Sequence, residues 1–369
     1  MGLLDKIFCV MTAVCLGSFL GFIMQRGRFC LNSAFRDIFF LRDFTLFRAY
    51  LVCVVVAIIG SNLMEDLGLL MTINEESGEI VRLELVRQNF VPVANIVGGF
   101  LFGLGIVLAG GCASGIVFRF GEGRAAALVS IMGFLSGIVV TSNGLLSPVH
   151  SYLKKFDFEI LGKRNPALWD LFGQGPLVKW ITIAVFSALT LVFVAKGKPF
   201  HFVKKGTAVQ GYPWELTGLY IGILATVAWW ISSFFGGVPQ GLAITLPLRD
   251  FFSTLLSRTS HVPLPGFSFL GIFKGSWGIF FTLAIPLGAF LSAKDLHEFK
   301  WRPPNIKEAV TGFSGGILMG VGAVFAGGCN LGHGITGIST MAVSSFVTVA
   351  AIVLGNWTMV YFRFIKAVS

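Results

Sequence analysis

The sequence predicts an all-α polytopic membrane protein built from two inverted repeats. Of its 369 residues, 55% are hydrophobic and 12% are charged, and the mean hydropathy is +0.81. A soluble chain would carry roughly twice that fraction of charged residues. The segments 98–112 and 315–329 match at ten of fifteen positions with a constant offset of 217, and both end in Ala-Gly-Gly-Cys. Such an internal duplication in apolar sequence is typical of transporters made of repeated helix bundles.

Apolar stretches of about 20 residues are long enough to span a bilayer, and they predict about nine membrane-crossing helices. Two shorter apolar stretches are interrupted by glycine or proline, so we expect them to be re-entrant. The crossing segments lie near 7–24, 46–63, 91–120, 124–146, 177–195, 214–235, 273–292, 307–335 and 339–364, and the re-entrant ones near 25–41 and 237–256.

The distribution of charge predicts the orientation of the chain. Basic residues concentrate in the connections 196–205 and 294–307, whereas the stretch 65–87 carries six acids against two arginines. By the positive-inside rule, the N-terminus lies outside and the C-terminus lies in the cytoplasm. The net charge of +10 therefore indicates contact with the lipid bilayer, not binding to nucleic acid. The first segment has no small-residue cleavage site, so we expect it to remain as a membrane helix.

The chain is predicted to form a single integral membrane domain, 1–369, with an internal 4+1+4 arrangement of crossings. The first repeat covers 1–150, and the second, inverted repeat covers 209–369. Between them, 151–208 holds an outside loop, a linking helix and a basic cytoplasmic loop. A single linking helix turns the second repeat upside down relative to the first. The duplication extends to Arg36-Asp37 and Arg249-Asp250, which lie towards the ends of the two re-entrant stretches at an offset of 213.

Each Ala-Gly-Gly-Cys motif lies in the middle of a crossing segment. A glycine pair at membrane depth breaks the helix and exposes backbone amides, which are tolerated only where they line a cavity or meet a ligand. The half-helix after each break presents its positive end to that cavity, which favours an anion. The predicted pathway residues are the glycines, the thiols and two polar residues expected to cap the half-helices: Gly110, Gly111, Gly327, Gly328, Cys112, Cys329, Ser114 and Asn330.

The same residues have a simpler interpretation. Glycines four residues apart, as in Gly99–Gly103 and Gly316–Gly320, are the ordinary means of close helix packing in lipid. A buried cysteine is most often a small hydrophobic residue. Packing is the interpretation that we favour for the remaining cysteines of the apolar segments, Cys9, Cys15 and Cys53. For the two matched motifs, we favour a pathway role.

A third thiol, Cys30, lies in a re-entrant stretch directly after Arg26 and Arg28. Two positive charges beside a thiol would attract an anion and favour the thiolate. The alternative is that both arginines only anchor the cytoplasmic side.

Other polar residues are accessory candidates. Arg119 and Glu122 could form a local ion pair at the end of the first broken helix. His333 follows Cys329 by four residues, so it is either a proton-responsive lining residue or a histidine that bonds to the backbone. The chain contains no CxxC or His-rich metal motif, and we expect no cofactor.

The stretches GFIMQRGRFCLNSAFRD, GGFLFGLGIVLAGGCASG and AGGCNLGHG resemble the YeeE/YedE family of bacterial inner-membrane proteins, and the order of elements is closest to the YeeE thiosulfate uptake proteins. The resemblance implies an hourglass-like shape and uptake of thiosulfate. It also implies that Cys30, Cys112 and Cys329 pass the ion inward through S–H···S contacts. A small cytoplasmic TusA-like sulfur-handling protein is the partner that the family suggests.

Two other functions remain open at this stage, besides that of a structural membrane subunit, in which the motif cysteines could be changed without loss of uptake. A membrane sulfurtransferase would carry a persulfide on a low-pKa cysteine, for which Cys30 has the most suitable setting. A transporter of another sulfur or selenium compound would use the same polarisable thiols. We favour thiosulfate transport without an enzymatic step.

Overall fold

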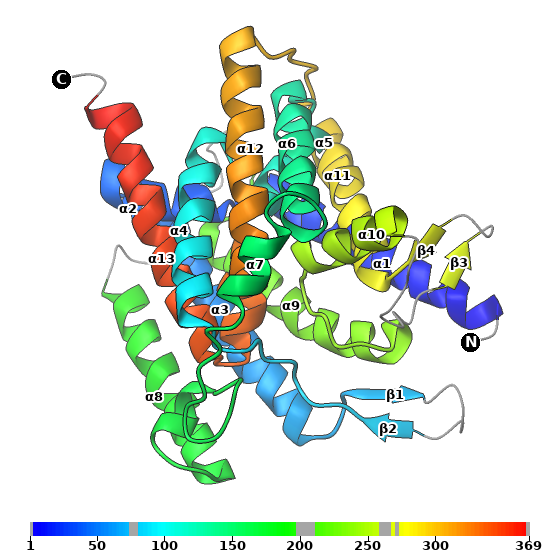
Figure 1. Cartoon of the computed structure of the whole chain (residues 1–369), viewed down its shortest axis with the longest axis vertical. Coiled ribbons are helices and arrows are strands. Elements are labelled where there is room, and N and C mark those ends of the chain that lie inside the picture. The colour runs from blue at the N-terminus through cyan, green and yellow to red at the C-terminus, as the bar shows by residue number, and fades with distance from the viewer. Residues whose placement is uncertain (1–2, 74–79, 197–210, 258–266, 270–272, 367–369) are drawn as a thin grey trace.

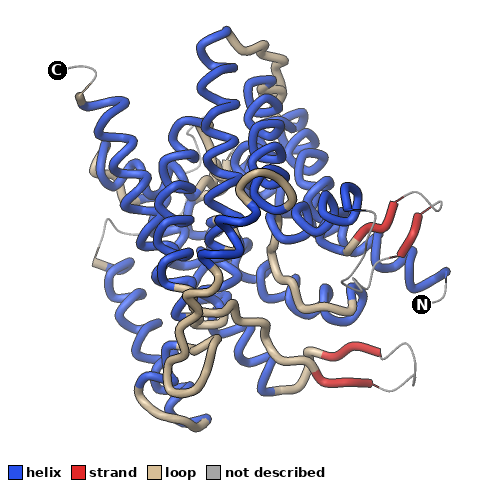
Figure 2. Tube along the Cα trace, in the orientation of Figure 1, coloured by secondary structure: helices blue, strands red, loops and turns tan. Residues whose placement is uncertain are grey.

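The computed structural model describes residues 3–73, 80–196, 211–257, 267–269 and 273–366 (Figure 1). Nearly all of the basic connection 196–205 lies outside these ranges, as do three acids of the predicted outside stretch, Glu75, Glu76 and Glu79. Within the described ranges the chain is helical apart from loops and two short antiparallel hairpins (Figure 2). The hairpins are β1 (Met71–Ile73) with β2 (Ile80–Arg82), and β3 (Phe267–Phe269) with β4 (Phe273–Gly275).

The all-α polytopic class is confirmed. In the described part of the chain, nine helical segments are long and apolar enough to cross a membrane. The helices of the first half are α1 (Leu3–Arg26), α2 (Leu31–Phe40), α3 (Thr45–Asp66), α4 (Pro92–Leu108), α5 (Ala113–Gly121), α6 (Ala125–Ser142) and α7 (Ser147–Leu153). Then come η1 (Leu168–Leu171), α8 (Pro176–Ala195), α9 (Trp214–Gly236), α10 (Thr245–Ser257), α11 (Trp277–Asp295), α12 (Ile306–Ala326), η2 (Gly332–Gly337), α13 (Val343–Val360) and η3 (Tyr361–Ile365).

Helices of one half pack mainly on helices of the other half, and they do so reciprocally. α1 packs on α11 while α3 packs on α9, and α6 packs on α12 while α13 packs on α4. The remaining large contact joins α4 to α12, the two helices that carry the duplicated glycine segment (Figure 1). The counterparts in the two repeats are α1 and α9, α3 and α11, α4 and α12, and α6 and α13. If each helix is exchanged for its counterpart, the same packing pairs result, as two repeats around a two-fold axis require. The repeat boundaries near 150 and 209 stay a prediction.

Glycines allow the central helices to approach closely. A Cβ atom built on Gly98 would lie 2.7 Å from the Gly322 carbonyl oxygen, and one on Gly322 would lie 2.6 Å from the Gly98 carbonyl oxygen. Elsewhere in the same crossing, a Cβ atom on Gly105 would lie 2.8 Å from the Gly315 carbonyl oxygen, and one on Gly315 would lie 2.4 Å from the Ala109 amide nitrogen. The packing role of in-helix glycines is therefore confirmed, since no larger residue fits without moving a backbone.

Two further features relate the halves. In α2, Arg36 forms an ion pair with Asp37 at 2.7 Å, and in α10, Arg249 does the same with Asp250 at 2.7 Å. The linking helix α8 lies at the margin of the bundle beside α3. Lys179 anchors it there through ion pairs to Glu65 and Asp66.

Candidate functional site

The first break in the helices is built around a left-handed glycine. α4 ends at Leu108, Gly110 has φ +74°, and α5 begins at Ala113. In the second half, Gly327 has φ +86° after the end of α12. A positive φ is costly for residues with a side chain, which explains why the first glycine of each pair is required.

Cys112 is the N-cap residue of α5, and its sulfur accepts a hydrogen bond from the Gly115 amide at 3.3 Å. The Ser114 hydroxyl lies 3.4 Å from the same sulfur. The predicted capping role of Ser114 is therefore wrong. The N-cap is the residue directly before the helix, whereas Ser114 already belongs to the first turn.

Cys30 and Cys112 form a buried pair of thiols. Their Sγ atoms lie 3.7 Å apart, within the range of a sulfur hydrogen bond, and both residues are almost fully buried. Cys30 precedes α2, and its side chain makes no capping bond to that helix. Gly115 makes the approach possible, because a Cβ atom there would lie 2.9 Å from one sulfur and 3.1 Å from the other. Gly115 was not among the predicted pathway residues, although it follows Cys112 by about one helical turn in the sequence Cys-Ala-Ser-Gly.

Asn330 lies beside this pair and carries unsatisfied polar atoms. Its side chain reaches the Cys112 sulfur and is completely buried. Neither its amide oxygen nor its amide nitrogen makes a hydrogen bond of ordinary length and angle, although the amide lies against the Cys112 sulfur. Each such atom costs about 1–3 kcal/mol, so a buried amide without partners calls for an explanation. The predicted capping role of Asn330 is also wrong, since a helical turn already begins at this residue.

Cys329, adjacent to Asn330, lines a cavity of about 200 Å³. Gly328 and Gly332 line it from the second broken helix, and Trp229 and Gln240 line it from the α9–α10 region. The cavity lies towards the face that carries the 83–91 segment and the beginning of α10. The third thiol is itself fully buried, and it borders this cavity at the end of the molecule opposite the connection 294–307.

A second cavity of about 310 Å³ adjoins the first, and the two share Gln88 in their linings. It is lined by the three cations Arg87, Lys154 and Arg249 and by one acid, Asp157. The Gln88 amide donates to the Gly327 carbonyl oxygen at 2.8 Å, which satisfies the broken end of α12. Neither Gln88 nor Lys154 carried a sequence signal, because both lie in irregular loop sequence.

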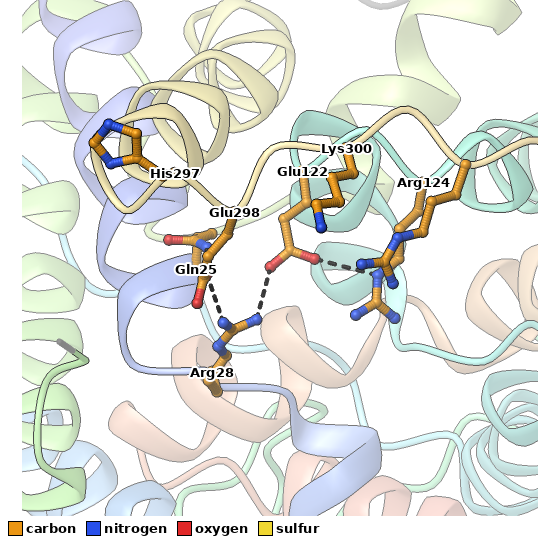
Figure 3. Close-up of a pocket in the computed structure, with 8 residues that line it drawn as sticks. Gln25, Arg28, Glu122, Arg124, His297, Glu298 and Lys300 are labelled. Atoms are coloured by element: carbon orange, nitrogen blue, oxygen red, sulfur yellow. Dashed lines mark hydrogen bonds and ion pairs between the residues drawn. The ribbon is translucent and has the colours of Figure 1, made fainter. Parts of the chain in front are cut away.

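The opposite end of the molecule carries a polar cavity of about 260 Å³, drawn in Figure 3. We call it the basic cup; it is lined by Gln25, Arg28, Glu122, Arg124, His297, Glu298, Lys300 and Arg302. Arg28 joins Glu298 at 2.5 Å and Glu122 at 3.6 Å (Figure 3). Its φ of +51° is unusual for a residue with a side chain. Arg28, which lines the cup, therefore lies only two residues before Cys30 in the chain.

Both arginines that the sequence suggested as neighbours of Cys30 pair with acids. Arg26 forms an ion pair with Asp295, and Arg28 is held by the acids of the cup. Arg119 instead lies at the break, with its guanidinium 3.3 Å from the position of a Cβ atom at Gly111. Folding brings α5 back against the break, which adjacency in sequence does not reveal.

Two accessory candidates are also placed. In the described ion pairs, Glu122 is joined to Arg28 and Arg124, so the suggested local pair with Arg119 is wrong. His333 bonds to the Ala326 carbonyl oxygen and to the Ser345 hydroxyl, each at 3.0 Å. Of the two roles that the sequence suggested for His333, the structure shows the bond to the backbone.

Fold and site define a multi-pass membrane protein in which broken helices bring thiols and an unpartnered amide together between cavities at its two ends. The family model described as sulphur transport matches residues 26–358, so the chain belongs to the sulphur transport family, as the YeeE/YedE resemblance predicted. The chain is 32% identical over 367 residues to the thiosulfate transporter TsuA of Spirochaeta thermophila, covering 96% of this chain and 99% of that protein.

Two further relatives have curated names. The chain is 29% identical over 369 residues to the thiosulfate transporter TsuA of Escherichia coli, covering 97% of this chain and 95% of that protein. The chain is 32% identical to the probable transporter YedE of Escherichia coli over 112 residues, which cover 30% of this chain and 24% of YedE.

Proposed function

We propose that this protein carries thiosulfate across the bacterial inner membrane, from the outside to the cytoplasm, without chemical change. The observation that carries the proposal is the buried sulfur pair, Cys30 and Cys112, at 3.7 Å. Thiosulfate is a dianion with one soft terminal sulfur and three hard oxygens. Thiols suit the soft end, while amide groups and half-helix ends suit the oxygens. The names of the two TsuA relatives support the same substrate.

In this proposal the ion enters through the cavity that contains Lys154 and Arg249, and then reaches Cys329 in the adjoining cavity. Asn330 connects Cys329 to Cys112, and its unpartnered amide hydrogen-bonds to the oxygens of the passing ion. Cys30 receives the ion last, beside the basic cup. Because each contact is weak, the ion is released as readily as it is bound.

The orientation and the cellular partner are part of the proposal. The N-terminus lies outside, the C-terminus lies in the cytoplasm, and the basic cup opens to the cytoplasm by the positive-inside rule. A small TusA-like sulfur-handling protein accepts the ion there. Removal of the imported thiosulfate by such a partner would maintain the inward gradient of the ion.

The deciding experiment is uptake of labelled thiosulfate into proteoliposomes, with sulfate and selenite as competitors. We expect saturable uptake that sulfate competes with poorly, because sulfate has no soft sulfur. Uptake equal to that of empty liposomes, or stronger competition by sulfate than by unlabelled thiosulfate, would contradict the proposal.

A membrane sulfurtransferase is the second candidate, and the position of Arg119 at the break that carries the Cys30–Cys112 pair favours it, since a nearby cation stabilises a thiolate. Mass spectrometry after incubation with thiosulfate separates the two functions. A persulfide on Cys30 that forms and turns over would support the enzyme. Transport without chemical change predicts unmodified Cys30.

A further inference from the structure

The basic cup contains more positive than negative charge. Four cations line it, Arg28, Arg124, Lys300 and Arg302, against two carboxylates, Glu122 and Glu298. Both carboxylates are joined to Arg28 or Arg124. Among the ion pairs of the described residues, Lys300 and Arg302 have no acidic partner. The cup therefore holds two positive charges that nothing in the described structure neutralises.

The backbone holds two of these cations side by side. Arg124 and Arg302 face one another in a parallel bridge, with the Arg302 amide donating to the Gly123 carbonyl oxygen at 2.9 Å and the Ala125 amide donating to the Arg302 carbonyl oxygen at 3.1 Å. Gly123 permits this contact, since its φ is +91° and a Cβ atom there would lie 2.6 Å from the Lys300 carbonyl oxygen. Neighbouring like charges repel, and an anion between them would remove that cost.

The carboxylate inside the cup is loosely held. Glu122 is 7% exposed, and its Oε1 atom has no hydrogen-bond partner. Its ion pairs are long, 3.6 Å to Arg28 and 3.4 Å to Arg124. Glu298, in contrast, accepts a hydrogen bond from the Gln25 amide at 3.0 Å in addition to its contact with Arg28. Thus Glu298 is fixed, whereas Glu122 can give up its contacts to another anion.

We infer that the basic cup is a binding site for a small divalent oxyanion, held by Arg124, Lys300 and Arg302. Charged donors that converge on a cavity suit the oxygens of a sulfate, phosphate or thiosulfate ion. Because Arg28 of the cup lies two residues before Cys30 in the chain, the ion that occupies the cup in transport is thiosulfate leaving the thiols. This assignment of the cargo rests on the proposed function, whereas the binding of an oxyanion does not.

Equilibrium dialysis of the purified full-length protein against labelled sulfate at low ionic strength tests the site. Sulfate has the charge and the oxygens of thiosulfate but lacks its soft sulfur. We expect the double variant Lys300→Gln/Arg302→Gln to bind sulfate at least about tenfold more weakly, because two charge-assisted contacts are lost. The matched control is Lys307→Gln/Arg42→Gln, which removes the same two charges from exposed positions outside the cup and should change affinity less than about twofold.

Equal sulfate affinity in the two double variants, or no sulfate binding by the parent protein, would overturn the site. Thiosulfate uptake into proteoliposomes then tests the exit role, and we expect the cup variant to be several-fold slower than the control. Loss of sulfate binding with unchanged uptake would assign the cup to a regulatory ion and overturn the exit role. If the parent protein takes up no thiosulfate at all, the proposed function fails while the dialysis still decides whether the cup binds an oxyanion.

Discussion

Replacing Cys112 separates its role in transport from its role in the fold. The sulfur caps α5 by accepting the Gly115 amide at 3.3 Å, and it also contacts the Cys30 sulfur at 3.7 Å. Cys112→Ala removes both contacts. Cys112→Ser restores a capping oxygen, since serine is among the preferred N-cap residues, but it removes the soft sulfur.

The structure gives the expected magnitudes. An unsatisfied buried amide costs about 1–3 kcal/mol, and sulfur is a weak acceptor, so the free energy of unfolding should fall by about 1 kcal/mol in Cys112→Ala. That corresponds to a loss of about 2 °C in the thermal midpoint. Cys112→Ser should unfold within about 1 °C of the parent protein. Both variants should lose at least about nine-tenths of thiosulfate uptake, an effect of about 1.4 kcal/mol or more on the rate.

The assay is labelled thiosulfate uptake into proteoliposomes, with thermal unfolding followed on the same preparations. Cys53→Ala is the matched control, because Cys53 is also fully buried but has no thiol neighbour in the described contacts. It should lose stability and keep uptake. Uptake near the parent value in Cys112→Ser would refute the sulfur contact and leave only a capping role.

Three further predictions concern the surroundings of the thiols and the cup. Gly115→Ala should reduce uptake at least about fivefold, because its Cβ atom would separate the Cys30 and Cys112 sulfurs. The control is Gly332→Ala at the equivalent position of the second repeat, which should not reduce uptake because the nearest sulfur would lie 4.0 Å from its Cβ atom. Equal uptake in both variants would count against the sulfur pair. Asn330→Leu should raise the thermal midpoint while lowering uptake, because it removes two unsatisfied buried atoms; a lower midpoint would show that the amide is paired in the fold.

The third is a pH dependence. Burial raises the pKa of Glu122 above its ordinary value of 4.5, and the negative charge of Glu298 acts in the same direction. The positive charges of Arg124, Arg28 and Arg119 oppose this shift. The folded state then binds a proton that the unfolded state releases, so this contribution to stability is present at low pH and is lost as pH rises through the folded pKa. Glu122→Gln should flatten that part of the thermal midpoint–pH profile, and an unchanged profile would argue against it.

The membrane helices could be predicted well from the sequence because the bilayer imposes a minimum length and composition on each of them. The segment predicted at 214–235 is α9, Trp214–Gly236, and the one predicted at 177–195 is α8, Pro176–Ala195. The breaks were predictable for the same reason, since a glycine pair at membrane depth has few structural uses. Features of this kind depend only on residues that are close together in the sequence.

The electrostatics of the site could not be predicted, because they depend on contacts between distant segments. The sequence left open whether Arg28 acts on the Cys30 thiol or only anchors the cytoplasmic side, and it gave no sign that Arg28 pairs with Glu298, 270 residues away. Arg119 is 89 positions from Cys30 in the sequence, yet its guanidinium lies beside Gly111, next to the Cys112 thiol that contacts Cys30. The same limit applies to Gln88, which bonds to the break in α12 from a loop without any recognisable motif.

The reciprocal packing of the halves has a consequence for how the protein is made. Since α1 rests on α11 and α3 on α9, the first half has no partner for its longest helices when it leaves the ribosome. Its broken helix must wait in the lipid, with unpaired backbone groups, until the last crossing is synthesised. Assembly is thus a late, all-or-none event, and a chain that stops after the linking helix should be recognised and degraded by membrane quality control. Two half-length chains produced together, in contrast, should find each other and restore the complete protein.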